Sequence, residues 1–185
     1  MGMDVYGLDP KTEMAKPHID WSANPSDEEK NAYFDAYYKW EAENPGGYFR
    51  NNVWWWRPLW DFVCVSCGDF LTEDDWKLGH ENSGHQIDKE TALAIAERIE
   101  FLLKVKAVTK YKEERQKKLD ELPQVTCHCC EGTGKGAHYS AGKPTCHVCH
   151  GTGLVDDSEK QYPFDEENVK EFGIFAKHSG GFKIC

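Results

Sequence analysis

The spacing of apolar residues between positions 26 and 43 predicts the first helix of the chain. Ser26 followed by Glu29 is the sequence of a capping box, and the Asn-Pro-Gly-Gly run at 44–47 ends the segment. An aromatic stripe follows the helical period, and such a stripe usually packs into a core. A partner-binding groove is the less expected alternative. The stripe consists of Tyr33, Tyr37 and Trp40, with Phe34 and Tyr38 beside it.

A longer periodic segment predicts one continuous helix from Lys89 to about Glu121. Asp88 precedes it as a cap, and Pro123 lies just beyond its end. We expect its first half to pack on the body of the protein and its charged second half to project. The apolar residues of the first half are Ala92, Ile95, Ala96, Ile99, Leu102 and Leu103.

The two ends of the chain are predicted to meet. Asp165 begins a last helix, and Gly180 ends it in the left-handed conformation that glycine adopts readily. The alternating residues at 182–184 and at Met3–Tyr6 then predict two short strands that pair with each other.

Composition restricts the class of protein without identifying it. The chain has 185 residues, of which 39% are hydrophobic, so it can bury one ordinary core and a small appendage. It contains neither an apolar run that could span a bilayer nor a secretory signal pattern. Paired cysteines without such a signal favour reduced thiols over disulfides, and we expect a cytoplasmic protein that does not bind membranes.

A repeated phrase between residues 127 and 153 predicts a metal site. The segments CHCCEGTG at 127–134 and CHVCHGTG at 146–153 share six of eight positions. Two turns with the spacing Cys-x2-Cys supply the four thiolates of a structural zinc shell. A redox dithiol or a disulfide is the alternative, but neither needs the Gly-Thr-Gly tail twice. The predicted ligands are Cys127, Cys130, Cys146 and Cys149, with Cys129 as a spare thiol and His128, His147 and His150 as solvated groups.

The repeat resembles the cysteine-rich CxxCxGxG domain of DnaJ-type chaperones and that of anti-TRAP, a bacterial protein-binding regulator. This resemblance implies a β-hairpin zinc knuckle at 123–155. The chain lacks the His-Pro-Asp tripeptide of a J-domain, so recruitment of an Hsp70 is not expected. The predicted fold is therefore mainly α, with a small zinc-knuckle β-hairpin module and a short two-stranded sheet from the termini.

A second resemblance covers most of the remaining chain. Segments 1–7, 48–60 and 179–185 are similar to a family of small bacterial and phage proteins of unassigned function. This resemblance leaves out 8–46, which looks like an insertion, and it implies no activity. We expect 1–122 and 156–185 to form an α-rich body. If the protein is phage-encoded, it would act in the host cytoplasm.

The spacing Cys64-x2-Cys67-x12-His80-x4-His85 matches a second zinc site of the two-Cys, two-His type. Gly79 and the glycine at 84 weaken the helix that would present the histidines. The alternative is a pair of buried cysteines followed by a polar loop.

The densest aromatic stretch lies at 48–60. Three consecutive tryptophans cannot all face inward, so Trp54 or Trp55 is expected at the surface or beside a pocket with Arg50 and Arg57. An enzyme site near Arg50, Arg57, His80 and His85 is the third functional hypothesis.

Charge provides the second functional hypothesis. Residues 104–153 contain nine basic and five acidic residues, whereas the whole chain has a net charge of −10. Such a basic arm favours RNA or single-stranded nucleic acid, with Lys112, Arg115 and Lys117 on phosphates and Tyr139 available for stacking. The first hypothesis is a non-enzymatic adaptor or inhibitor that binds a protein partner, because an all-cysteine zinc site leaves no open position for catalysis. Host interference or anti-defence by a phage protein is the suggested context.

Overall fold

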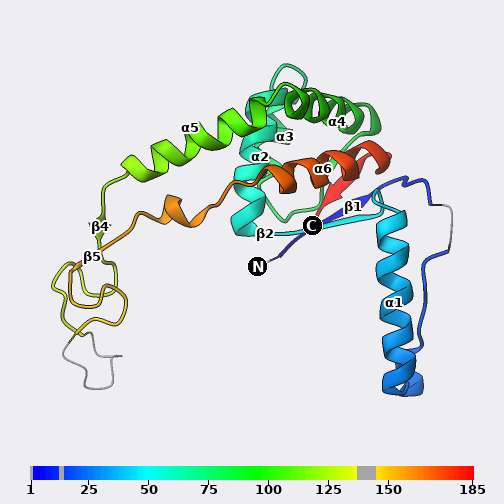
Figure 1. Ribbon diagram of the computed structural model, residues 1–185, viewed down its shortest axis with the longest axis horizontal. Helices are drawn as coiled ribbons and strands as arrows, with labels where there is room; N and C mark the ends of the chain where they lie inside the picture. The colour runs from blue at the N-terminus through cyan, green and yellow to red at the C-terminus, as the bar shows by residue number, and fades with distance from the viewer. Residues whose placement is uncertain (1, 13–14, 137–144) are drawn as a thin grey trace. The chain divides into compact units, whose positions relative to one another are not determined.

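The computed structural model describes residues 2–12, 15–136 and 145–185, which form two compact units (Figure 1). Unit 1 contains Met1–Thr109 and Phe164–Cys185, and unit 2 contains Lys110–Pro163. In the described part of the chain, helices dominate over two small sheets, as the sequence predicts. The α-helices are α1 (Asp27–Glu43), α2 (Val53–Cys67), α3 (Glu73–Leu78), α4 (Lys89–Lys104), α5 (Ala107–Glu121) and α6 (Glu166–His178), and the 3-10 helices are η1 (Trp21–Ala23) and η2 (Ser158–Gln161).

Unit 1 is built around an antiparallel sheet in the order β2-β1-β6-β3. Its strands are β1 (Gly2–Gly7), β2 (Tyr48–Asn52), β3 (His85–Ile87) and β6 (Phe182–Ile184). The predicted pairing of the termini is confirmed, because Val5 lies opposite Ile184. The two-stranded size was wrong, since β2 and β3 extend the sheet on either side. The short strands at 48–52 and 85–87 lack enough alternation to have been recognised from sequence.

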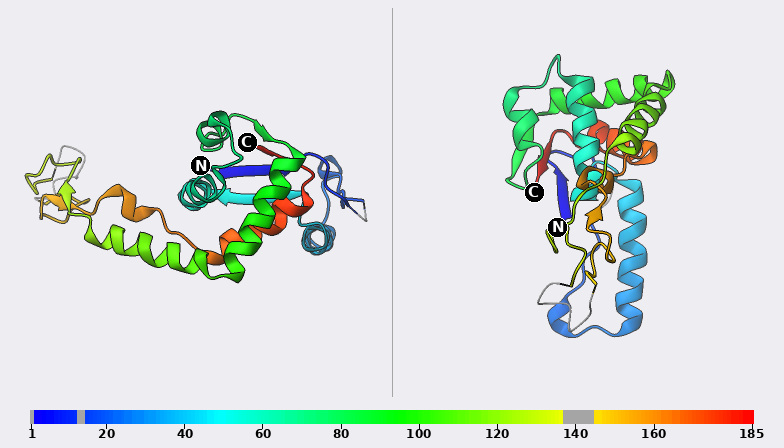
Figure 2. Two further views of the ribbon diagram at one scale, coloured as in Figure 1. Left: turned by 90° about the horizontal axis from the view of Figure 1, so that it is seen from above. Right: turned by 90° about the vertical axis from the view of Figure 1, so that its left-hand side faces the viewer.

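One face of this sheet is buried against helices and contributes to the hydrophobic core. Burial alternates along β1, where Met3 and Val5 are buried, as the period of two in a strand requires. Helices α2 and α6 pack against the sheet, and α4 packs on α6 (Figure 2). Trp56 and Trp60 stack at 5.5 Å between ring centroids, and the edge of Phe172 meets Trp56.

The helix predicted from Lys89 to Glu121 is broken in two. Helix α4 ends at Lys104, and Lys106 has a φ of 59°, which an α-helix cannot contain. Helix α5 begins at Ala107. The caps at Ser26, Asp88 and Asp165 are confirmed, because each side chain accepts a hydrogen bond from a backbone amide of its helix. Gly180 has the predicted positive φ, at 64°.

Candidate metal centre

Two similar turns form the tip of unit 2. Strands β4 (Val125–Thr126) and β5 (Leu154–Val155) pair beside the first cysteine, and an equivalent bridge joins Lys135 to Thr145 beside the second repeat. The turns also exchange equivalent backbone hydrogen bonds. The amide of Cys127 donates to the Gly153 carbonyl and that of Cys146 donates to the Gly134 carbonyl, both at 2.9 Å. The internal repeat of the sequence is therefore an approximate two-fold repeat of structure.

The four repeated cysteines meet at the centre of these turns. Cys127, Cys130, Cys146 and Cys149 are all buried, and their sulfur atoms lie within 4.8 Å of one another. The Sγ–Sγ distances are 3.9 Å for Cys127–Cys146 and 3.6 Å for Cys130–Cys149. A disulfide requires about 2.05 Å. Four sulfurs around a tetrahedral ion at about 2.3 Å each are separated by about 3.8 Å, so the arrangement can hold one metal ion.

The glycines of both repeats are required by the close approach of the turns. A Cβ on Gly134 would lie 2.3 Å from the Gly151 carbonyl oxygen, and one on Gly153 would lie 2.3 Å from that of Gly132. Both positions also have positive φ, at 69° and 76°, which favours glycine. The Gly-Thr-Gly tail thus lets each turn fold beneath the sulfur atoms of the other.

Backbone amides prepare the sulfurs to be anionic. The amide of Gly134 donates to Cys130 Sγ and that of Gly153 donates to Cys149 Sγ, each at 3.3 Å. The backbone amide of Cys149 lowers the pKa of Cys146 to about 6, so this thiol ionises readily. Burial raises the pKa of Cys130 to about 11, against the amide of Gly134. A cation bound by the four sulfurs would favour the thiolate form of Cys130, because its positive charge would offset the loss of solvation that burial causes.

The residues beside the four cysteines differ in exposure. Cys129 is half-buried and packs against the four-cysteine cluster. His128, His147 and His150 are exposed and do not belong to the group of residues that can share an ion. The hydroxyls of Thr133 and Thr152 donate to the carbonyls of Cys130 and Cys149 at 2.7 and 2.8 Å. These hydroxyls stabilise the turns, and the repetition of threonine in both segments is the sequence signal for this role.

The proposed second site is arranged differently. In the described ranges, Cys64, Cys67, His80 and His85 do not form a group that can share an ion. Both cysteines lie inside helix α2, where burial raises the pKa of each thiol to about 12.

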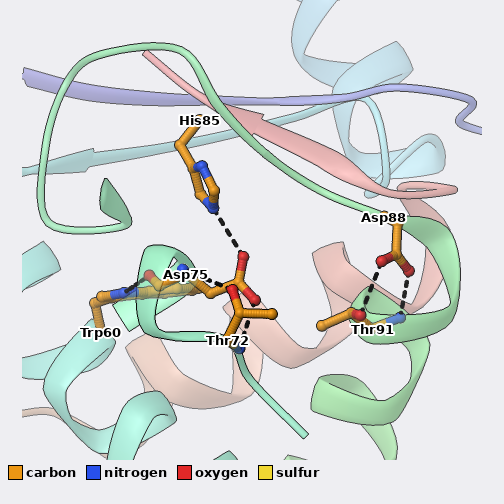
Figure 3. A network of polar contacts seen from close by, with 6 residues as sticks. All are labelled: Trp60, Thr72, Asp75, His85, Asp88 and Thr91. Carbon is orange, nitrogen blue, oxygen red and sulfur yellow. Dashed lines mark hydrogen bonds and ion pairs between the residues drawn. The ribbon is translucent and has the colours of Figure 1, made fainter. Parts of the chain in front are cut away.

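Carboxylates hold the two histidines instead. His85 Nε2 lies 2.8 Å from Asp75 Oδ1, and Figure 3 shows Asp75 also joined to Thr72 and Trp60. His80 Nε2 lies 3.2 Å from Asp61 Oδ1. These contacts join the segment after α3 to helices α2 and α3. The histidines of the predicted zinc spacing therefore belong to two Asp–His contacts, which we call the polar clasp. Only the acidic residues at 61 and 75 could have indicated these contacts in the sequence.

The other predicted binding residues lie on separate elements. Trp54 is exposed and Trp55 is half-buried at the start of α2, as the three-tryptophan argument predicts. On α5, Lys112 and Lys117 are exposed and Arg115 is half-buried. Arg50 lies on β2 and Arg57 on α2, and both are exposed. Tyr139 falls outside the described residues.

Comparisons of the chain with protein-family models, curated proteins and solved structures found no match. The resemblances to the DnaJ-type knuckle and to the phage family therefore stay predictions based on their motifs. No helix in the described part of the chain has the length and apolar content needed to cross a membrane.

Proposed function

We propose that this protein binds one zinc ion through Cys127, Cys130, Cys146 and Cys149, and that the folded knuckle binds a protein partner. The convergence of four buried sulfurs is the observation that carries the proposal. Soft thiolates in a tetrahedral arrangement select zinc over hard cations such as magnesium or calcium. The DnaJ-like repeat supports the same metal.

A four-thiolate shell suits architecture better than catalysis. Catalytic zinc keeps a coordination position for water, and four cysteine ligands fill all positions of a tetrahedral ion. Zinc binding to such peptides contributes on the order of 10–16 kcal/mol, which is comparable with the stability of a whole domain. The ion would therefore fold the two turns into one rigid surface, and an adaptor or inhibitor is the function that this supports.

A groove beside the knuckle supports a protein as the ligand of that surface. It has a volume of about 560 Å³, and its apolar lining includes Val125, Val148 and Val155. Asp156 and Asp157 add acidic groups at the same groove. Apolar side chains with a charged border are typical of protein interfaces. We propose a partner segment with apolar and basic residues, and a host protein as the partner if the chain is phage-encoded.

Nucleic acid is the alternative ligand, and the charge distribution weakens it. Unit 2 contains eight basic and eight acidic residues, because 156–159 offset the basic residues of α5. Lys110 also pairs with Glu114 at 3.6 Å. A neutral unit gains little from the phosphate attraction that dominates such binding.

The test combines metal analysis with partner capture. We expect one zinc per chain by mass spectrometry, and loss of that zinc in Cys146→Ser but not in Cys185→Ser. The wild type should capture a partner protein from host lysate, and Val155→Lys, which keeps the cysteines, should not. Treatment with nuclease should leave the capture by the wild type unchanged. Absence of bound zinc would refute the metal proposal. If Val155→Lys still captures the partner, the groove is not the binding site. Salt-sensitive binding of single-stranded RNA would favour the alternative function, provided that it weakens when Lys112, Arg115 and Lys117 are changed to Glu.

A further inference from the structure

A second groove lies in unit 1, between helix α1 and the face of the sheet that α2 and α6 leave open. The alternation that buries Met3 and Val5 directs Tyr6 to the opposite face, and Tyr48 and Arg50 on β2 follow the same rule. The groove has a volume of about 640 Å³, within the range of small-molecule sites. It is independent of the cysteine cluster, which belongs to unit 2.

Aromatic rings form most of its walls. Helix α1 contributes Phe34 and Tyr38, whose rings are stacked at 6.3 Å and are 41% and 63% exposed. The sheet contributes Tyr6 and Tyr48, whose ring centroids lie 5.2 Å apart. The core interpretation of the aromatic stripe is therefore correct only for Trp40, which is buried. Exposed ring faces of this kind stack on flat aromatic ligands.

Two cations lie in the same groove. Among the described residues, neither Lys16 nor Arg50 has a carboxylate within ion-pair distance. The Lys16 ammonium instead sits over the rings of Tyr37 and Trp40, at 5.2 and 5.6 Å from their centroids. Asp4 lies opposite Arg50 in the strand register, but its carboxylate accepts a hydrogen bond from the Tyr48 hydroxyl.

These cations are notable because their unit is acidic. Unit 1 contains 24 acidic and 14 basic residues, yet the groove lining holds two basic residues and one carboxylate, that of Glu41, while the nearby Asp4 carboxylate is bonded to Tyr48. The Glu41 carboxylate lies near the hydroxyl of Tyr37. A guanidinium that lacks a protein partner is well suited to bind a phosphate through two parallel hydrogen bonds. A carboxylate nearby can accept hydrogen bonds from sugar hydroxyls.

We propose that this groove binds a nucleoside phosphate, with the base stacked on the α1 rings and the phosphate held by Arg50. A neutral sugar would use the rings but would gain nothing from Arg50, and a basic peptide would be repelled by it. A long nucleic acid is disfavoured, because Asp27, Glu28 and Glu29 lie in the first turn of α1 and the unit as a whole is acidic. The ligand is therefore a single nucleotide.

Calorimetric titration of the full-length, zinc-loaded protein with AMP tests this site. We expect a dissociation constant tighter than about 1 mM. Adenosine, which lacks the phosphate, and ribose 5-phosphate, which lacks the base, should each bind at least about tenfold more weakly, because each loses one of the two contacts. Maltotriose serves as the neutral sugar and should not bind.

Variants locate the site. Arg50→Gln should weaken AMP binding about tenfold or more, whereas Arg57→Gln, an exposed arginine outside the groove, should leave it unchanged. Tyr38→Ala should also weaken binding, and Lys39→Gln on the same helix is its control. Thermal unfolding by tryptophan fluorescence verifies that each variant is folded. Absence of AMP binding, equal binding of adenosine, preference for maltotriose, or full binding by folded Arg50→Gln would each overturn the proposal.

Discussion

At the scale of single residues, Asp75 uses its side chain and its backbone to join three segments of the chain. Its carboxylate accepts a hydrogen bond from the backbone amide of Thr72 and pairs with His85, and its own backbone amide donates to the Thr72 hydroxyl. Its own carbonyl accepts the indole N–H of Trp60 at 3.2 Å. Burial opposes ionisation, but the Thr72 amide and His85 lower the pKa of Asp75 below its usual 3.8. The ionised form is therefore the one that the folded protein stabilises.

This pKa shift predicts a dependence of stability on pH. Asp75→Asn should lower the free energy of unfolding of unit 1 by about 1–3 kcal/mol at pH 7. The folded pKa is the lower one, so the contribution is complete above the unfolded pKa and is lost as pH falls below about 4. The difference between wild type and variant in urea titrations, followed by tryptophan fluorescence, should shrink over that range.

The neighbouring pair supplies the matched control. Asp61 also contacts a histidine, but its side chain is 55% exposed. Asp61→Asn should therefore lower the free energy of unfolding by less than about 1 kcal/mol. This account would be contradicted if the difference in free energy of unfolding between wild type and Asp75→Asn stayed constant down to pH 3. Equal losses of free energy in the two variants would also contradict it.

At the scale of elements, the break between α4 and α5 concentrates strain at one residue. Lys106 adopts a φ of 59°, which costs a residue with a Cβ about 1 kcal/mol but costs glycine little. Lys106→Gly should therefore raise the free energy of unfolding by several tenths of a kcal/mol to about 1 kcal/mol. Lys104→Gly, in the last turn of α4, should lower it by a similar amount. Urea denaturation measures both, and stabilisation by Lys104→Gly would show that the break is misplaced.

The same break shows what the sequence can predict at this scale. The caps at Ser26, Asp88 and Asp165 act through neighbours in the chain, so their side-chain chemistry was sufficient. The cysteine turns were equally local, because spacing and glycines together define them. Lys106 carries no such signal, because a positive φ is uncommon for lysine and nothing in its side chain favours it. The carboxylate partners of His80 and His85 are likewise tertiary, and spacing alone suggested a metal instead.

At the scale of the whole molecule, charge and hydrophobic burial divide along the same boundary. Unit 1 carries the entire net charge of −10, and unit 2 is neutral. Among the residues that the structure describes, the buried aromatic ones all lie in unit 1, whereas the buried cluster of unit 2 consists of the four cysteines. Unit 1 therefore has a hydrophobic core of its own, whereas the proposed zinc ion would take the place of such a core in the knuckle.

This division predicts separate responses to metal removal. All seven tryptophans lie in unit 1, so their fluorescence reports that unit alone. A zinc chelator should make segment 127–153 sensitive to trypsin at Lys135 and should leave the tryptophan-detected unfolding midpoint unchanged. Cys146→Ser should show the same cleavage without chelator, and Cys185→Ser should resist it. A chelator-induced fall in the tryptophan midpoint would mean that the ion also stabilises unit 1, and continued resistance at Lys135 would mean that the knuckle folds without a metal.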